Sequence, residues 1–206
     1  LYAVIGQRLG HPIHAVGVPR HAFARFDDGK TRINIETTDK GVELPDSYYR
    51  SMGAWSDEDA AAIGHGKTLT SAEFAAVLHS YAARHLGSLE KHEAALAQID
   101  KAIRLWPGNE SFALERLGTL YYGLGKRDEA IKGYSSLAES ARSPEIRVRA
   151  ILGLAGDLQA HDKHENALDL LRLAFRDAPK SVVPSVLGEM ASSYRTLRRF
   201  PEALLS

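Results

Sequence analysis

The chain has 206 residues, of which 44% are hydrophobic, and this length suits one large domain or two small ones. Its 26 Lys and Arg residues balance its 26 Asp and Glu residues, which argues against nucleic acid or an anionic membrane as the main partner, since both demand a cationic surface. Cysteine is absent, which excludes disulfides, thiolate-ligated zinc and a cysteine nucleophile among these residues.

No apolar run approaches the roughly 20 residues that span a bilayer, and no signal peptide is visible. The chain begins without a methionine, and both ends fall within helical patterns, so we expect a piece cut from a longer chain. For this reason, whether a targeting segment precedes residue 1 is an open question. The compartment is therefore undetermined, with the cytoplasm as the default.

Residues 1–55 are predicted to combine one helix with β-strands. The helix comes first, where apolar residues recur at helical spacing and Gly10 is expected to end it in a left-handed conformation. The apolar positions are Leu1, Val4, Ile5 and Leu9. Three short β-rich runs follow, at residues 13–18, 22–26 and 31–36. We therefore expect an α+β part built on an antiparallel hairpin.

A tight turn is predicted at Asp28-Gly29, because a two-residue type I′ turn needs positive φ at both positions. Pairing outward from this turn places His21 directly opposite Glu36. Their face would also carry Phe23, Arg25, Arg32 and Asn34. The opposite face is apolar and suits a core, since it would carry Ala22, Ala24, Phe26, Ile33 and Ile35. A one-residue slip, or a bulge at the turn, would separate His21 from Glu36.

The predicted pair has a specific chemistry. A carboxylate beside an imidazole fixes its tautomer and stabilises its protonated form, as in the base and orienting group of a nucleophilic hydrolase or acyltransferase. The stretch RLGHPIHAVGVPRHAFARFDDGKTRINIETT resembles the C-terminal half of a bacterial transglutaminase-like domain, of the papain-like cysteine superfamily. The resemblance implies that His21 takes the histidine position and Glu36 the aspartate position. It also implies that the helix before Gly10 is the end of the nucleophile helix.

The sequence departs from that family in three places. Glu36 replaces the usual aspartate, Arg20 precedes the histidine where a small glycine is common, and no cysteine is present. Two explanations are open: the nucleophile lies upstream of residue 1, or this member has lost it. A sheet without its nucleophile helix would expose apolar surface, so we expect a homodimer or disorder near residues 1–12.

Residues 56–70 are expected to connect two parts of the chain. Ser56 with Asp59, and Thr70 with Glu73, have the spacing of a helix-capping box. Three aromatic residues gather just before this segment: Tyr48, Tyr49 and Trp55. They are expected to pack the hairpin part onto the first helical repeat. The alternative is an aromatic wall near His21.

From residue 71 the chain is predicted to be an all-α helical solenoid. Aligned alanines in successive segments lie roughly 35 residues apart, the period of a helix-turn-helix repeat. These alanines are Ala95, Ala130, Ala167 and Ala203. The clearest copy, LGTLYYGLGKRDEAIKGY at residues 117–134, resembles the tetratricopeptide repeat. The expected repeats are residues 71–108, 109–143, 144–180 and an incomplete 181–206.

The tetratricopeptide resemblance implies a concave groove, lined by the first helix of each pair, in which a protein or peptide partner binds. The positions that it places towards the groove are Ser80, Arg84, Glu115, Thr119, Tyr122, Arg149, Leu152, Gln159 and Arg195. Because arginine forks favour carboxylates, an acidic peptide or a protein C-terminus is a candidate ligand. The alternative is that these residues are solvated edges of the groove.

Our leading hypothesis is a protein-interaction module, in which a four-repeat array is joined to a transglutaminase-like fragment that lacks a nucleophile. The alternative is a thiol hydrolase or acyltransferase whose cysteine lies upstream, with His21 as base and Glu36 orienting it. No cofactor is expected. No metal is expected either, because His161 and His164 are only three residues apart in a predicted turn, with no third ligand fixed by the sequence.

Overall fold

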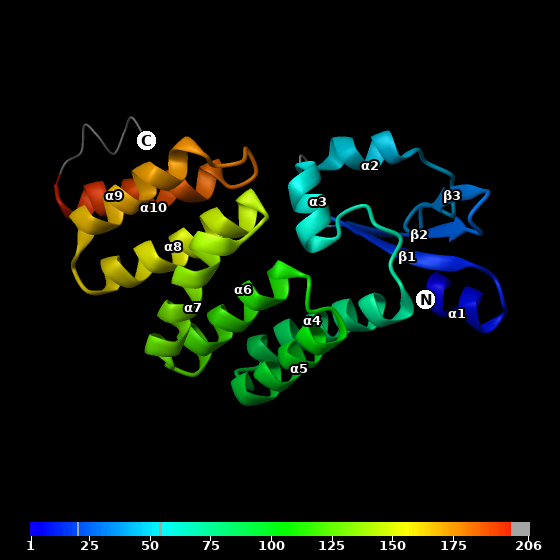
Figure 1. Cartoon of the computed structure of the whole chain (residues 1–206), viewed down its shortest axis with the longest axis horizontal. Helices are drawn as coiled ribbons and strands as arrows, with labels where there is room; N and C mark the ends of the chain where they lie inside the picture. Colours follow the sequence, from blue (N-terminus) through cyan, green and yellow to red (C-terminus); the bar gives the residue numbers. More distant parts are fainter. Residues whose placement is uncertain (20, 54, 199–206) are drawn as a thin grey trace.

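The computed structural model describes residues 1–19, 21–53 and 55–198. Figure 1 shows a small sheet with short helices at one end, followed by a curved array of longer helices. Within the described residues, no helix combines the length and apolar character needed to cross a bilayer. The chain therefore has the α+β start and helical continuation that the sequence predicts.

Helix α1 (Tyr2–Arg8) ends where the sequence predicts. Gly10 has a φ of 80°, and the amides of Gly10 and His11 donate to the carbonyls of Gln7 (3.1 Å) and Gly6 (2.9 Å), the two hydrogen bonds of a Schellman cap. Gly6 approaches the next strand so closely that a Cβ there would lie 2.7 Å from Ile13 Cδ1. A glycine at this position therefore lets α1 lie directly on the sheet.

Three antiparallel strands form the sheet, in the order β1-β2-β3. They are β1 (Ile13–Val18), β2 (His21–Asp27) and β3 (Arg32–Ile35). Ala24 pairs with Ile35, and Asp27 pairs with Arg32. This register differs from the predicted one by two residues, so the predicted two-residue turn is wrong.

The turn is longer because the side chain of Asp28 organises it. Asp28 Oδ1 accepts hydrogen bonds from the amides of Lys30 (2.9 Å) and Thr31 (2.6 Å), while Gly29 keeps a positive φ of 84°. These bonds draw Lys30 and Thr31 into the loop instead of the ladder. Because the slip is an even number of residues, each side chain stays on its predicted face of the sheet.

Both faces of the sheet are covered. Helix α1 packs on the face that carries Ile13, and the segment after β3 covers the opposite face. The predicted apolar face is covered by α1, and the opposite face, whose burial the sequence did not indicate, is covered as well. The opposite face carries a core cluster of Val16, Val18, Phe23 and Tyr49. It also buries three polar side chains, those of Arg25, Asn34 and Glu36.

Two short helices follow the sheet, α2 (Asp46–Met52) and α3 (Asp57–Ile63). The predicted capping boxes are confirmed at the start of α3, between Ser56 and Asp59, and at the start of the first long helix, between Thr70 and Glu73. Both pairs satisfy amides that the first helical turn leaves without partners.

The aromatic residues around α2 cover the sheet. The ring of Tyr49 stacks on Phe23, with 3.7 Å between centroids, and lies 6.1 Å from the ring of His21. Trp55 packs against the same core cluster. The expectation that these aromatic residues join the hairpin part to the first repeat is wrong, because α2 folds back over the sheet. The alternative expectation, an aromatic wall near His21, agrees with the position of Tyr49.

The helices then pair into repeats. They are α4 (Ser71–Ser88), α5 (His92–Leu105), α6 (Glu110–Gly118), the π-helical turn η1 (Thr119–Gly123), α7 (Arg127–Ser140), α8 (Pro144–Ala160), α9 (His164–Arg176) and α10 (Val183–Thr196). The aligned alanines Ala95, Ala130 and Ala167 are fully buried, which lets the paired helices approach closely. Ala203 and Arg20 lie outside the described residues.

Helix α3 joins the sheet to the repeats. The side-chain amide of Asn109, at the start of α6, donates to the carbonyl of Ile63 at 3.0 Å. The carboxylate of Asp59 bonds the hydroxyl of Ser143 and accepts from the amide of Glu145 at 3.3 Å, at the start of α8. The N-terminal ends of two successive first helices therefore contact the same short helix.

Candidate functional sites

His21 and Glu36 are brought together, but not as the directly opposite residues that were predicted: the observed register directs Glu36 towards Phe23, and the two side chains meet diagonally. His21 begins β2, Glu36 directly follows β3, and Nε2 of the imidazole lies 2.8 Å from Oε2 of the carboxylate. Glu36 is 4% exposed. Its Oε1 accepts from the amide (2.9 Å) and hydroxyl (2.6 Å) of Thr38, and its Oε2 accepts from the hydroxyl of Tyr49 at 3.2 Å. The carboxylate is thus held by four hydrogen bonds.

These bonds keep Glu36 ionised. Burial by itself would raise the pKa of Glu36, but the hydrogen bonds from Thr38 and His21 outweigh it and lower the pKa to about 2. Burial and the neighbouring carboxylate raise the pKa of Tyr49, so its hydroxyl stays a donor. An ionised, fixed carboxylate orients the imidazole through Nε2 and leaves Nδ1 as the nitrogen that could accept a proton.

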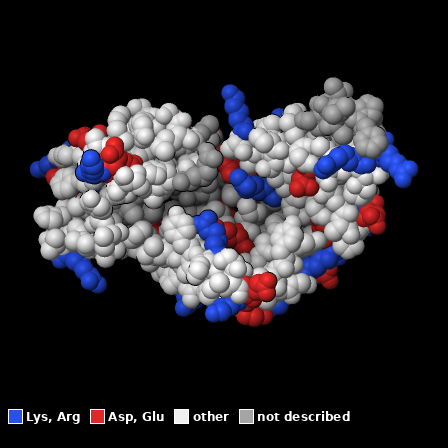
Figure 2. Space-filling view, turned by 180° about the vertical axis from the view of Figure 1, so that it is seen from behind, with Lys and Arg blue, Asp and Glu red and all other residues white. Residues whose placement is uncertain are grey.

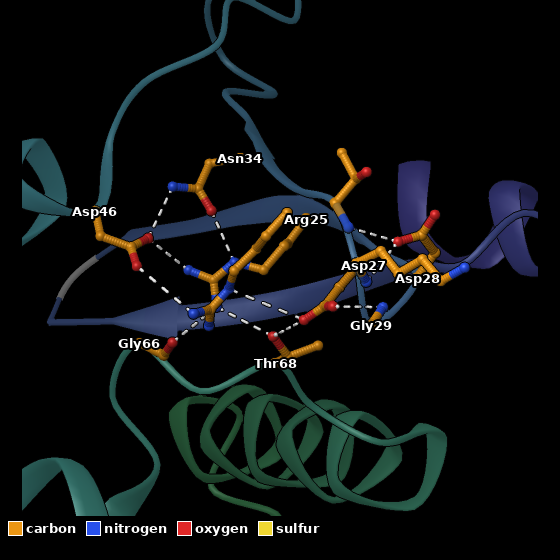
Figure 3. Close-up of polar contacts among 11 residues, drawn as sticks. Arg25, Asp27, Asp28, Gly29, Asn34, Asp46, Gly66 and Thr68 are labelled. Atoms are coloured by element: carbon orange, nitrogen blue, oxygen red, sulfur yellow. Dashed lines mark hydrogen bonds and ion pairs between the residues drawn. The ribbon is translucent and has the colours of Figure 1, made fainter.

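A second polar cluster, centred on Arg25, was missed by sequence reasoning. Arg25 is 1% exposed, and Figure 3 shows its guanidinium between β3, α2 and the loop before α4. Its nitrogens donate to Asn34 Oδ1 (2.7 Å), Asp46 Oδ1 (2.7 Å), the carbonyl of Gly66 (3.0 Å) and Thr68 Oγ1 (3.1 Å). The alternation of side chains along a strand predicts that Arg25 and Asn34 share a face of the sheet. No local sequence pattern predicts the other partners of Arg25, which lie 21 or more residues further along the chain.

Four of the predicted groove residues line one pocket of about 310 Å³ between α4, α5 and α6 with η1: Arg84, Glu115, Thr119 and Tyr122. Glu115 Oε2 accepts from the hydroxyl of Ser80 at 2.7 Å, and its Oε1 lies 3.8 Å from Nε of Arg84. Burial raises the pKa of Glu115, against the opposing effects of Ser80 and Arg84. Tyr122 is 77% exposed, a high value for a large aromatic side chain.

The other predicted groove residues do not line this pocket. Arg149 pairs with Glu145 one turn earlier in α8, with Nε 2.8 Å from Oε1. Gln159 Nε2 donates to the carbonyl of Glu189 (3.0 Å) and to Ser193 Oγ (2.9 Å), so it ties α8 to α10. Arg195 is exposed in the last turn of α10. Leu152 packs against a core cluster of the third repeat.

The described residues contain no group of three or more His, Cys, Asp or Glu that could hold a metal ion. The ring of His161 instead bonds the carbonyl of Asp157 through Nδ1, at 2.7 Å. On the face in Figure 2, the coloured Lys and Arg residues are scattered among Asp and Glu without forming a continuous basic patch. That face is hollowed between the sheet part and the helical array.

Comparisons with known proteins identify the fold of the helical part. No family model matches the chain, and no curated protein matches it. Among solved structures, the chain is similar to PilF of Pseudomonas aeruginosa, with 21% identity, a TM-score of 0.51, and 64% of this chain and 57% of that chain covered. It is also similar to apo RapI, with 12% identity, a TM-score of 0.50, and 67% and 42% covered.

The tetratricopeptide repeat domain of Arabidopsis OM64 matches with 14% identity and a TM-score of 0.48, over 63% of this chain and 98% of that one. PilF is a tetratricopeptide repeat protein, and its similarity shows that the helical part has a tetratricopeptide-like fold. The chain spans a little over half of the PilF structure. A transglutaminase-like relationship for the N-terminal part is not shown by these comparisons.

Proposed function

We propose that the chain is a protein-interaction module that binds a peptide segment of a partner between its first two repeats. The observation that carries this proposal is the 310 Å³ pocket between α4 and α6 with η1, beside the largely exposed ring of Tyr122. Tetratricopeptide-like arrays present such concave surfaces to their ligands. A π-helical turn borders the pocket, and such turns occur frequently at functional sites.

The charges in the groove favour an anchor that is apolar or aromatic. Arg84 lies close to Glu115, and Arg149 bonds Glu145, so these two cations already face carboxylates of the chain. A carboxylate ligand would have to displace those partners. A side chain that packs against Tyr122 would instead cover exposed aromatic surface, which favours binding through the hydrophobic effect.

Selection of peptides from a random phage-displayed library on the purified chain tests the proposal. Enriched peptides, made synthetically with a fluorophore, are expected to lose about tenfold or more in affinity with Tyr122→Ala or Glu115→Gln. The matched control is Phe175→Ala, which removes a 43% exposed aromatic residue from α9, outside the pocket. An equal loss with Phe175→Ala, or no enrichment of any peptide, would contradict the proposal.

A second candidate function rests on the His21–Glu36 geometry. An imidazole oriented by a buried carboxylate at 2.8 Å is the base and orienting pair of thiol acyl transfer. The chain itself has no thiol, so the nucleophile would come from residues upstream of Leu1. The step would be attack of the thiolate on an amide carbonyl, with His21 accepting the thiol proton and later giving it to the leaving amine.

The residues encoded before Leu1 provide the first test of this second function. Helix α1 packs on the face of the sheet opposite His21, so the cysteine would have to lie upstream of α1, beyond the edge of the sheet, to approach the imidazole. Such a cysteine favours an enzyme, and the absence of one removes the hypothesis. If the cysteine exists, His21→Ala in the longer chain is expected to abolish alkylation of that thiol at neutral pH while leaving the helical content unchanged. Unchanged alkylation would disprove the pairing of thiol and imidazole.

A further inference from the structure

A second pocket, of about 210 Å³, lies over the sheet on the face opposite α1. Its wall is made by β2, α2 and the residues before α4, and it is separate from the peptide pocket in the repeats. The lining residues that matter for its chemistry are Arg25, Arg32, Asp46, Tyr49, Arg50 and Trp55. Its volume is below the ~300 Å³ at which pockets for drug-sized ligands begin, so its size suits a small molecule.

Two guanidinium groups of this pocket retain donors for a ligand. Arg25 is occupied by its four hydrogen bonds (Figure 3). Arg32 forms two loose ion pairs, at 3.9 Å to oxygens of Asp27 and of Asp46, but both lie beyond hydrogen-bond distance, and its side chain is 51% exposed, so its N–H groups stay available to a ligand that binds more closely. Arg50 makes one bond, from Nη2 to Asp57 at 3.1 Å, and its side chain is 60% exposed.

The remaining wall is aromatic and has an unsatisfied donor. Phe23 and Tyr49 stack on each other, with ring centroids 3.7 Å apart, and both line the pocket. Trp55 also lines it, with Arg50 over its ring at 5.8 Å. The indole N–H of Trp55 is buried, and no acceptor for it lies in the part of the chain that the structure describes. A buried donor without a partner costs free energy, which an acceptor oxygen reaching the indole would recover.

We propose that this pocket binds a small aromatic carboxylate. Arg32 and Arg50 hold the carboxylate, because the planar fork of a guanidinium matches two coplanar oxygens. The aromatic ring of the ligand lies among Tyr49, Phe23 and Trp55. Asp46 stays paired with Arg25 and excludes a second negative group on that side, which favours a single carboxylate over a phosphate.

Titration of the ¹⁵N-labelled chain with benzoate, followed by NMR, tests this assignment. The chain has two tryptophans, so the indole signal of Trp55 reports on the pocket and that of Trp106 is an internal reference. We expect a saturable shift of the Trp55 signal only. Benzamide, which has the same shape without the charge, and inorganic phosphate are each expected to bind about tenfold or more weakly.

Variants locate the site. Arg32→Gln and Arg50→Gln change half-exposed side chains, and each is expected to weaken benzoate binding about tenfold. Arg8→Gln makes the same chemical change in α1, on the other face of the sheet, and is expected to leave binding unchanged. Tyr122→Ala is expected to have no effect, since it lies in the repeats. The proposal is overturned by the absence of a saturable Trp55 shift, by equal binding of benzamide or phosphate, or by unchanged affinity in both Arg32→Gln and Arg50→Gln.

Discussion

Gly64 lies against the ring of Trp106, so closely that a Cβ on the glycine would come 2.7 Å from the ring carbon Cζ2. Gly64 ends α3 with a φ of 78°, and Trp106 ends α5. Together with the hydrogen bonds that Asp59 accepts and that Asn109 donates, this contact holds the sheet part against the first three repeats. At Gly64 the two parts meet through backbone and ring atoms, with no room for an added methyl group.

Gly64→Ala is expected to destabilise the chain by more than its backbone strain alone. Gly29→Ala is the matched control, because Gly29 has a similar φ of 84° but nothing within 4 Å of the added Cβ. The control should cost about 1–2 kcal/mol of unfolding free energy, from the left-handed backbone conformation. In urea unfolding, Gly64→Ala should lower the unfolding free energy clearly more than the control does. Equal costs would mean that Trp106 moves aside freely.

Glu36 should make the stability of the chain depend on pH in the acid range. Its pKa is about 2 in the folded chain against 4.5 ordinarily, a difference that corresponds to about 3 kcal/mol. Because the folded pKa is the lower one, this stability is present above pH 4.5 and is lost as the pH falls towards 2. In urea unfolding at a series of pH values, the unfolding free energy of Glu36→Gln should not show this decrease. Glu43→Gln, at an exposed carboxylate nearby, should retain the pH dependence of the parent chain.

Arg25→Met should be among the most destabilising substitutions in the sheet part. It removes a buried cation and leaves Asp46 and Asn34 without the guanidinium that both contact. Because the side chain of Asp46 is 54% exposed and water can solvate it, the expected cost is about 1–3 kcal/mol, from the partners that lose a charged donor. Arg25→Lys should not restore the stability, since one ammonium cannot reproduce the fork. Arg32→Met, at a half-exposed position on the next strand, should change the unfolding free energy by less than about 0.5 kcal/mol.

Asp157 should couple the second and third repeats. Its Oδ1 accepts from Tyr121 (2.8 Å) and from Arg127 Nε (2.6 Å), and its Oδ2 accepts from Arg127 Nη2 (2.6 Å). Asp157→Asn should lower the unfolding free energy by about 1–3 kcal/mol, because a buried carboxylate that accepts three hydrogen bonds becomes a neutral amide with one acceptor oxygen. Asp169→Asn removes an exposed carboxylate from α9 and should have little effect on the circular dichroism melting curve. A similar loss in both variants would contradict the coupling.

The parts of the fold that were predictable from sequence depend on local periodicity. Gly10 and the capping boxes act on neighbouring residues, so a short stretch of sequence predicts them. The aligned alanines are predictable because they recur at a regular spacing. The faces of the hairpin were also predictable, since strand side chains alternate. The register was not, because the carboxylate of Asp28 competes with the ladder for the amides of Lys30 and Thr31.

The arrangement of the site residues depends on distant partners. Arg25 is satisfied by residues as far along the chain as Thr68, and no local pattern indicates such a contact. Gln159 bonds Ser193 of α10, because neighbouring first helices approach within reach of a long side chain, and the sequence did not indicate this partner. Sequence periodicity indicates which side of a helix faces its neighbours, but the pairing on that side is settled by three-dimensional packing.

The π-helical turn at residues 119–123 has a consequence for length variation. The amide of Leu124 bonds the carbonyl of Thr119, five residues back, so this turn holds one residue more than an ordinary α-helical turn. Because such a turn accommodates an extra residue while the flanking helix keeps its direction, deleting a single residue here would restore regular α-helical winding with little rotation of α6 relative to the later helices. It would, however, change the spacing of Thr119 and Tyr122, which lie inside the turn. The same deletion elsewhere in α6 would leave the bulge in place and rotate the residues before it by about 100°.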